Sequence, residues 1–142
     1  MTNSNGTVAA RLARQLGIAV TRARNGHLAD VGLTVDQADA LTYYADHPGA
    51  TIADWKNQQH IAHQTARLVV QKLVERGLII STPSATDSRA KVNTLSPAGE
   101  AVRGQMYDGG EVTGRKLLAG LSGDQQAQFI QLLRKCLDNL DS

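Results

Sequence analysis

The stretch that decides the fold is Ile61–Leu95, IAHQTARLVVQKLVERGLIISTPSATDSRAKVNTL. Its first half predicts a helix, because four apolar residues recur at i, i+3, i+4 and i+7 and share one face. These residues are Ala66, Val69, Val70 and Leu73. Gly77 ends the pattern, so we expect a helix that packs its apolar face against a core.

The second half of the stretch predicts a two-stranded hairpin. An apolar run, Leu78-Ile79-Ile80, is followed by polar residues at 81–86 and by a return segment that begins Asp87-Ser88-Arg89. The end of this return segment, Lys91–Leu95, is rich in residue types that favour strands. Because the loop is longer than a tight turn needs, we expect a projecting tip.

The predicted helix carries an unusual outer face, formed by Gln64, Arg67, Leu68 and Gln71. A solvated helix face is more often rich in Lys and Glu. Amide and guanidinium groups can instead bond base edges bidentately, and a leucine can contact thymine methyl groups. We therefore interpret this helix as one that reads DNA, and we call it the reading helix.

Positive charge gathers around the reading helix. From His60 to Leu95 the chain holds five basic and two acidic residues, although its total net charge is only +2. The basic residues are Arg67, Lys72, Arg76, Arg89 and Lys91. Contact with phosphates requires such a concentration, and a chance fluctuation over a short window is the alternative.

Length and composition favour a single globular domain over residues 1–142. Apolar runs are far shorter than the roughly 18 residues that span a bilayer. The segment Met1–Thr7 is polar and uncharged rather than a signal sequence. We therefore expect no membrane association and a cytoplasmic location. Cys136 is the only cysteine, so no intrachain disulfide is possible and a reducing compartment fits.

Three helices are predicted before the reading helix. Residues 8–30 lack proline and place apolar residues among arginines, as in an amphipathic helix. Thr34 and Gln37 form a capping box for a helix over 35–47. A short helix over 51–59 follows, and two short helices around a tight turn are typical of a helix-turn-helix. Trp55 is the expected apolar anchor of the short helix, and His60-Ile61 forms the expected turn.

Two further helices are predicted after the hairpin. Ser96 caps a helix from Pro97 to about Leu118, although its interior glycines each penalise it by about 1 kcal/mol. We expect a kink or close small-residue contacts there. Ser122 and Gln125 cap a last helix, whose apolar stripe contains Phe129, Leu133, Cys136 and Leu140, with Ile130 and Leu137 beside it. Such a wide apolar face needs a partner, so we expect a homodimer.

Three segments carry a family resemblance: Gly32-Leu33-Thr34-Val35-Asp36-Gln37, Leu73-Val74-Glu75-Arg76-Gly77-Leu78-Ile79, and Asp87-Ser88-Arg89-Ala90-Lys91 running to Leu95-Ser96-Pro97-Ala98-Gly99. With these segments the chain resembles the MarR family of winged-helix transcriptional regulators from about Val8 onward. The resemblance implies a mainly α fold. A winged helix-turn-helix would occupy 33–95, and dimerisation helices would occupy 8–30 and 97–140.

The resemblance also implies contacts with double-stranded DNA. A homodimer would place one reading helix from each subunit in successive major grooves of a pseudopalindromic site. Carried over by position, the reading end of the helix consists of Ala62, His63, Gln64, Thr65 and Arg67, and we expect Leu68 and Gln71 to extend it. In the wing, Arg89 would enter the flanking minor groove, Lys91 would contact DNA beside it, and Asp87 would hold Arg89 by a charge-assisted pair.

Two positions before the reading helix depart from the family pattern. The family usually has Leu-Ala-x-x-Leu-Gly before the turn, whereas this chain has Gln59 and His60 at the Leu and Gly positions. The family's common arginine after the reading threonine is found one position earlier, as Arg67, with Leu68 following. The direction of the reading helix therefore depends on how this chain builds its turn.

A small-molecule effector is a further partner that the resemblance implies. The family commonly binds small aromatic or anionic molecules between the dimerisation helices and the reading unit. Tyr43, Tyr44 and His47 are candidates to line such a pocket, and Arg14 or Arg22 could meet an anion. Core packing or plain exposure is the alternative for the aromatic residues.

Other chemistry is not expected. Cys136 lies in an apolar stripe, which favours a buried, inert thiol. His60 and His63 lack partners at ligand spacing, so neither a metal nor a cofactor is predicted. No phosphate loop, His-Glu-x-x-His, Cys-x-x-Cys or nucleophile elbow indicates an enzyme. Asp36 and Asp39 are interpreted as charges that complement a helix dipole.

The sequence thus predicts a dimeric DNA-binding repressor that a small aromatic or anionic ligand releases from its operator. A redox-sensing regulator that uses Cys136 is one alternative. A winged-helix adaptor that binds protein rather than DNA is another.

Overall fold

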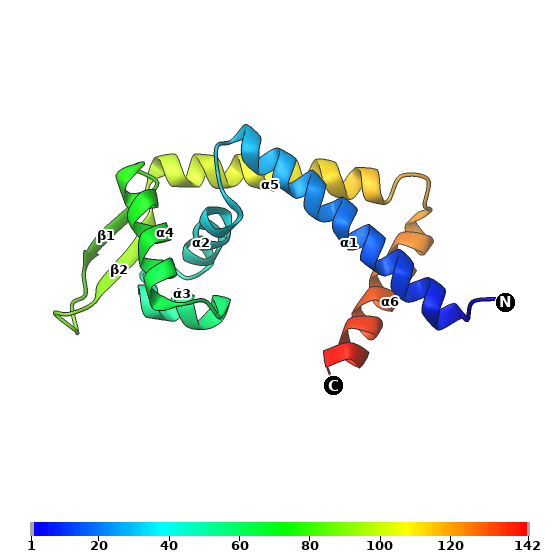
Figure 1. Cartoon of the computed structure of the whole chain (residues 1–142). Coiled ribbons are helices and arrows are strands. Elements are labelled where there is room, and N and C mark those ends of the chain that lie inside the picture. The colour runs from blue at the N-terminus through cyan, green and yellow to red at the C-terminus, as the bar shows by residue number, and fades with distance from the viewer. Residues whose placement is uncertain (1, 142) are drawn as a thin grey trace. The chain divides into compact units, whose positions relative to one another are not determined.

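The computed structural model describes residues 2–141 (Figure 1). Its helices are α1 (Asn5–Asp30), α2 (Val35–Asp46), α3 (Ile52–Gln59), α4 (His63–Glu75), α5 (Pro97–Leu117) and α6 (Gly123–Asp141), and its strands are β1 (Ile79–Pro83) and β2 (Lys91–Leu95). The chain forms two compact units, the first ending at Gly110 and the second beginning at Glu111. The predicted winged helix-turn-helix is confirmed and lies within the first unit.

Local capping explains where several helices begin. Thr34 Oγ1 accepts from Gln37 N at 3.2 Å, and Gln37 Oε1 accepts from Thr34 N at 3.1 Å, as the predicted capping box requires. Thr51 and Asp54 form a second box at the start of α3. The helix α1 begins three residues earlier than predicted, at Asn5, because Ser4 caps it through Thr7 N.

The core lies in the winged helix-turn-helix. Its largest fully buried apolar side chains are Trp55 of α3, Tyr44 and Leu41 of α2, and Leu73 of α4. Burial of each such side chain stabilises the fold by about 1.5–3 kcal/mol. The predicted inner face of the reading helix is confirmed, since Ala66, Val70 and Leu73 are buried and Val69 is half-buried.

The hairpin is longer than predicted. Antiparallel pairing runs from Ile79 opposite Leu95 to Pro83 opposite Lys91, so the tip outside the two strands is only 84–90. A third segment joins it, because Asn93 N donates to Ala50 O at 2.9 Å and Gly49 N donates to Asn93 O at 3.0 Å. These bonds fasten the loop after α2 to the base of the wing.

Helix α5 begins directly after the hairpin and contacts its base. Ser96 caps it as predicted, accepting from Gly99 N at 3.0 Å and donating to the carbonyl oxygen of Gly77. The helix runs from Pro97 to Leu117 as one element. One of the close small-residue contacts that we expected is at Gly109, where a Cβ would lie 3.0 Å from His27 Cβ.

The second unit contains α6, whose predicted capping box is present. Ser122 N donates to Gln125 Oε1 at 2.9 Å, and Gln125 N donates to Ser122 Oγ at 3.2 Å. No residue of α6 is buried. The expectation of a buried Cys136 is therefore wrong for the single chain, in which this residue is exposed.

None of the described helices is both long and apolar enough to cross a membrane.

Candidate nucleic-acid interface

The reading helix α4 presents the predicted polar face to solvent. Its N-cap, Ala62, makes no side-chain capping bond, so the first N–H groups of the helix are not capped by a side chain. All seven predicted helix contacts are exposed: Ala62, His63, Gln64, Thr65, Arg67, Leu68 and Gln71. Leu68 is 47% exposed, so its side chain is accessible for an apolar contact.

The far end of this face is partly engaged within the helix. Gln71 Nε2 lies 3.4 Å from Glu75 Oε1, a long and exposed hydrogen bond. Gln64, Arg67 and Leu68 make no such side-chain contact in the described part of the chain. They are therefore freer than Gln71 to meet a ligand.

The turn before α4 is built without the family's glycine. His60 adopts φ 59° and ψ 44°, a left-handed conformation that residues with a side chain rarely adopt. His60 N and Ile61 N both donate to Lys56 O, which closes the end of α3. Figure 1 shows α3 and α4 meeting at this turn, with the hairpin beside α4.

The wing tip is ordered by short side chains. Ser84 Oγ accepts from Thr86 N and from Asp87 N, both at 3.2 Å. Asp87 Oδ1 accepts from Arg89 N at 2.9 Å, which forms an Asx turn. This corrects the predicted pair, because among residues 2–141 Asp87 holds the backbone of Arg89 and no ion pair joins their side chains. Arg89 is exposed in this turn.

One of the five basic residues has a structural role instead. Arg76 Nη1 donates to Gly32 O at 2.8 Å and to Gln37 Oε1 at 3.4 Å, so it fastens the end of α4 to the α1–α2 loop. The other four, Arg67, Lys72, Arg89 and Lys91, are exposed. They therefore form the positive surface around the reading helix and wing.

The aromatic residues of α2 divide between core and surface. Tyr44 is fully buried and its hydroxyl donates to Thr51 O at 3.0 Å, and burial raises its pKa to about 12. Tyr43 packs edge-on against Tyr44 and stacks on His47 with ring centroids 4.4 Å apart. Burial, with Asp54 nearby, raises the pKa of Tyr43. The structure thus favours the core alternative for Tyr44.

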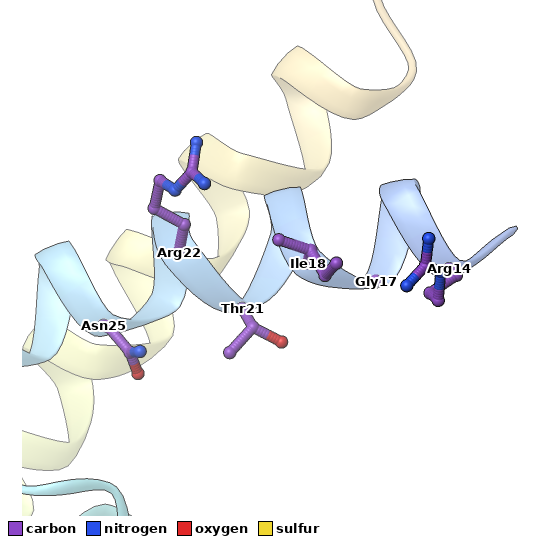
Figure 2. Close-up of a pocket in the computed structure, with 6 residues that line it drawn as sticks. All are labelled: Arg14, Gly17, Ile18, Thr21, Arg22 and Asn25. Carbon is purple, nitrogen blue, oxygen red and sulfur yellow. The ribbon is translucent and has the colours of Figure 1, made fainter. Parts of the chain in front are cut away.

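Arg14 lies elsewhere, in a shallow hollow on one side of α1. The described lining residues are Arg14, Gly17, Ile18, Thr21, Arg22 and Asn25. Figure 2 shows Thr21 and Asn25 projecting to one side of the helix and Arg22 to the other, with Ile18 between. The α2 aromatic residues do not line this hollow, so the structure does not bring together the predicted effector residues.

Within residues 2–141, no group of three or more histidine, cysteine, aspartate or glutamate side chains could hold a metal ion. His60 and His63 flank the turn at the start of the reading helix.

Asp39 has a structural role that its sequence context did not predict. This residue is not merely a helix-dipole charge, because Oδ1 accepts from Arg24 Nη2 at 2.6 Å and Oδ2 accepts from Gln59 Nε2 at 2.8 Å. The replacement of an expected leucine by Gln59 was the one sequence signal, since a polar residue there needs a partner.

Comparison with known proteins matches residues 31–90 to the MarR family. HTH-type transcriptional repressors of Mycobacterium bovis and Mycobacterium tuberculosis are 25% identical to the chain over 108 residues. The matched segment covers 76% of this chain and 78% of each repressor.

Solved structures share the fold over most of the chain. Apo MarR from E. coli has a TM-score of 0.80 at 22% identity, covering 96% of this chain and 98% of that one. The PcaV transcriptional regulator from Streptomyces coelicolor has a TM-score of 0.76 at 25% identity, covering 94% and 97%. A mutant E. coli MarR complexed with operator DNA has a TM-score of 0.72 at 22% identity, covering 90% and 92%. The mycobacterial proteins are named as transcriptional repressors and PcaV is named as a transcriptional regulator.

Proposed function

We propose that this chain is a transcriptional repressor of the MarR family of winged-helix regulators and that it binds a pseudopalindromic DNA site as a homodimer. The observation that carries the proposal is the exposed face of α4 beside a wing in which Arg89 is exposed and its backbone is held by Asp87. Both elements offer groups that bind DNA rather than groups that perform a reaction.

In the proposed complex, α4 enters the major groove. Gln64 can bond adenine and Arg67 can bond guanine, each through two hydrogen bonds, and Leu68 can contact a thymine methyl group. Arg89 enters the minor groove beside it, where a narrow A·T-rich segment attracts a guanidinium. Lys91 and Lys72 supply further positive charge for the phosphates.

The homodimer is supported by exposed apolar surface at both ends of the chain. On α6, Ile130, Leu133, Leu137 and Leu140 are 39–84% exposed, and on α1, Leu12 and Ile18 are more than half exposed. Monomeric proteins rarely leave such a stripe in water. A two-fold dimer would also present two reading helices to half-sites about one helical turn apart.

Release by a small ligand is part of the proposal. The lining of the hollow on α1 includes Arg14 and Arg22 together with Thr21 and Asn25, and such positive and polar groups suit a small anionic molecule. Redox control through Cys136 is the second candidate, and it requires that this thiol, which is exposed in the single chain, also stays accessible in the dimer.

The test is DNA binding at two salt concentrations. The protein is titrated with a random-sequence duplex at about 50 and 200 mM salt, and with a duplex selected from a random library. We expect tighter binding of the selected duplex and a steep loss of affinity at higher salt, because counterions are released from phosphates. Affinity without salt dependence, or no enrichment of any sequence, would support the protein-binding adaptor instead.

A further inference from the structure

The last residue of α3 is tied to α1 through one carboxylate of α2. Gln59 Nε2 donates to Asp39 Oδ2 at 2.8 Å, and Arg24 Nη2 donates to Asp39 Oδ1 at 2.6 Å. The Asp39 side chain is only 26% exposed. Each carboxylate oxygen therefore holds one donor, and the two donors belong to different helices.

This carboxylate acts next to the turn that directs the reading helix. Gln59 is followed by His60, whose left-handed conformation changes the direction of the chain, and Ala62 is already the N-cap of α4. So short a connection can absorb little movement, and a displaced Gln59 would displace α4 with it. A leucine at position 59 could make only apolar contacts, whereas the Gln59 amide makes a directional hydrogen bond.

We infer that Asp39 is a positioning residue of the reading helix: it orients α4 for base contact by fixing the end of α3 against α1. The inference rests on the proposed function and identifies Asp39 as the residue that sets the orientation of the reading helix. It also explains how the turn holds its geometry although Gln59 and His60 replace the family's leucine and glycine.

The two hydrogen bonds of Asp39 can be disrupted by one substitution and restored by a second. Asp39→Asn keeps the shape, but its NH₂ group must face one of the two donors, so one hydrogen bond is lost. Adding Gln59→Glu restores both bonds, because the new amide donates to the new carboxylate while its oxygen still accepts from Arg24. Gln59→Leu removes only the bond to α3.

The experiment compares affinity for the duplex that the wild-type protein selects from a random library with affinity for a random-sequence duplex. We expect Asp39→Asn and Gln59→Leu to bind the selected duplex about three- to tenfold more weakly. Affinity for the random duplex should change by less than about twofold, because phosphate contacts dominate it. The double variant should recover the wild-type ratio of the two affinities.

Asp46→Asn is the matched control. Asp46 lies on the same helix and faces Arg103 at 3.8 Å, but both side chains are well exposed, so we expect no change in either affinity. If Asp39→Asn fails to fold, the comparison of the two duplexes is made with Gln59→Leu.

The inference is overturned if the single variants keep their affinity for the selected duplex, lose affinity for both duplexes equally, or are not rescued by the double variant. A wild-type protein that enriches no sequence would overturn the proposed function instead.

Discussion

At the scale of single residues, Gly99 is where the fold depends most directly on the absence of a side chain. A Cβ there would lie 2.1 Å from the Leu78 carbonyl oxygen. The same oxygen accepts from Ser96 N at 3.1 Å, so it cannot withdraw without disturbing the junction of hairpin and α5.

Gly99→Ala should therefore lower the free energy of unfolding by about 1–3 kcal/mol, as overpacking does. Gly104→Ala is the control in the same helix, because a Cβ there would have no atom within 4 Å apart from its chain neighbours and the adjacent backbone of the helix itself. It should raise the free energy of unfolding by about 0.5–1 kcal/mol. Urea unfolding measures the free energy of unfolding of both variants. If both substitutions changed this free energy in the same direction, the close packing at Gly99 would not be the cause.

Tyr44 should make stability depend on alkaline pH. Its pKa is raised from 10.0 to about 12 by burial, so between these values the folded state keeps a proton that the unfolded state has lost. Its contribution is fully present below pH 10 and is lost as pH rises toward 12, by up to about 2–3 kcal/mol. Unfolding by urea at pH 9 and 11 measures the loss.

Between pH 9 and pH 11, the free energy of unfolding of Tyr44→Phe should fall less than that of the wild type. The variant should already be less stable at pH 9, because it lacks the hydrogen bond to Thr51 O. Tyr107→Phe alters a tyrosine that is 65% exposed, so its free energy of unfolding should fall as much as that of the wild type. Equal losses in all three proteins would exclude Tyr44 as the source.

At the scale of elements, the reading helix and the wing have separable tasks. Gln64→Ala on α4 should relax discrimination at one or two base pairs, by about 1–3 kcal/mol for a lost bidentate contact. Binding to a library of singly substituted sites measures this. An unchanged preference at every position would remove Gln64 from the set of base readers.

Arg89→Ala in the wing should lower affinity about tenfold and reduce the salt dependence, because a charged contact is lost while the helix still reads its bases. The dimer should remain intact by sedimentation. Ser88→Ala, one residue away in the same tip, is the control. Affinity equal to that of the wild type would exclude the wing from binding.

Elements were predicted well where their determinants are local. The capping boxes at Thr34 and Ser122 and the period of α4 involve neighbours within a few residues. The length of the hairpin was not predicted, because polar residues such as Ser81 and Thr82 pair with partners about ten residues away. Pairing across such a separation leaves no local signal in residue type.

At the scale of the whole molecule, the exposed face of α6 is the feature that a single chain leaves unexplained. Leu137 is 60% exposed on this face. Leu137→Lys should shift the protein from dimer toward monomer, because it places a charge in the proposed apolar interface. Affinity for the selected duplex should fall with it, since two linked reading helices bind more tightly than one.

Gln128→Lys is the control, because Gln128 is exposed and lies about opposite Leu137 by helical spacing. Analytical ultracentrifugation over a range of concentrations measures both variants. A Leu137→Lys protein that stays dimeric would place the subunit interface elsewhere.

The sequence by itself determined the helices, their caps, the reading face of α4 and the hairpin, because each depends on spacing within a few residues. Only the tertiary structure decided which distant groups meet. Asp39 joins Arg24 and Gln59 across 15 and 20 residues, Tyr44 enters the core, and Asp87 holds a backbone N–H rather than a guanidinium. Periodicity tells which side of a helix is buried, but a side chain finds its particular partner only when the helices pack together.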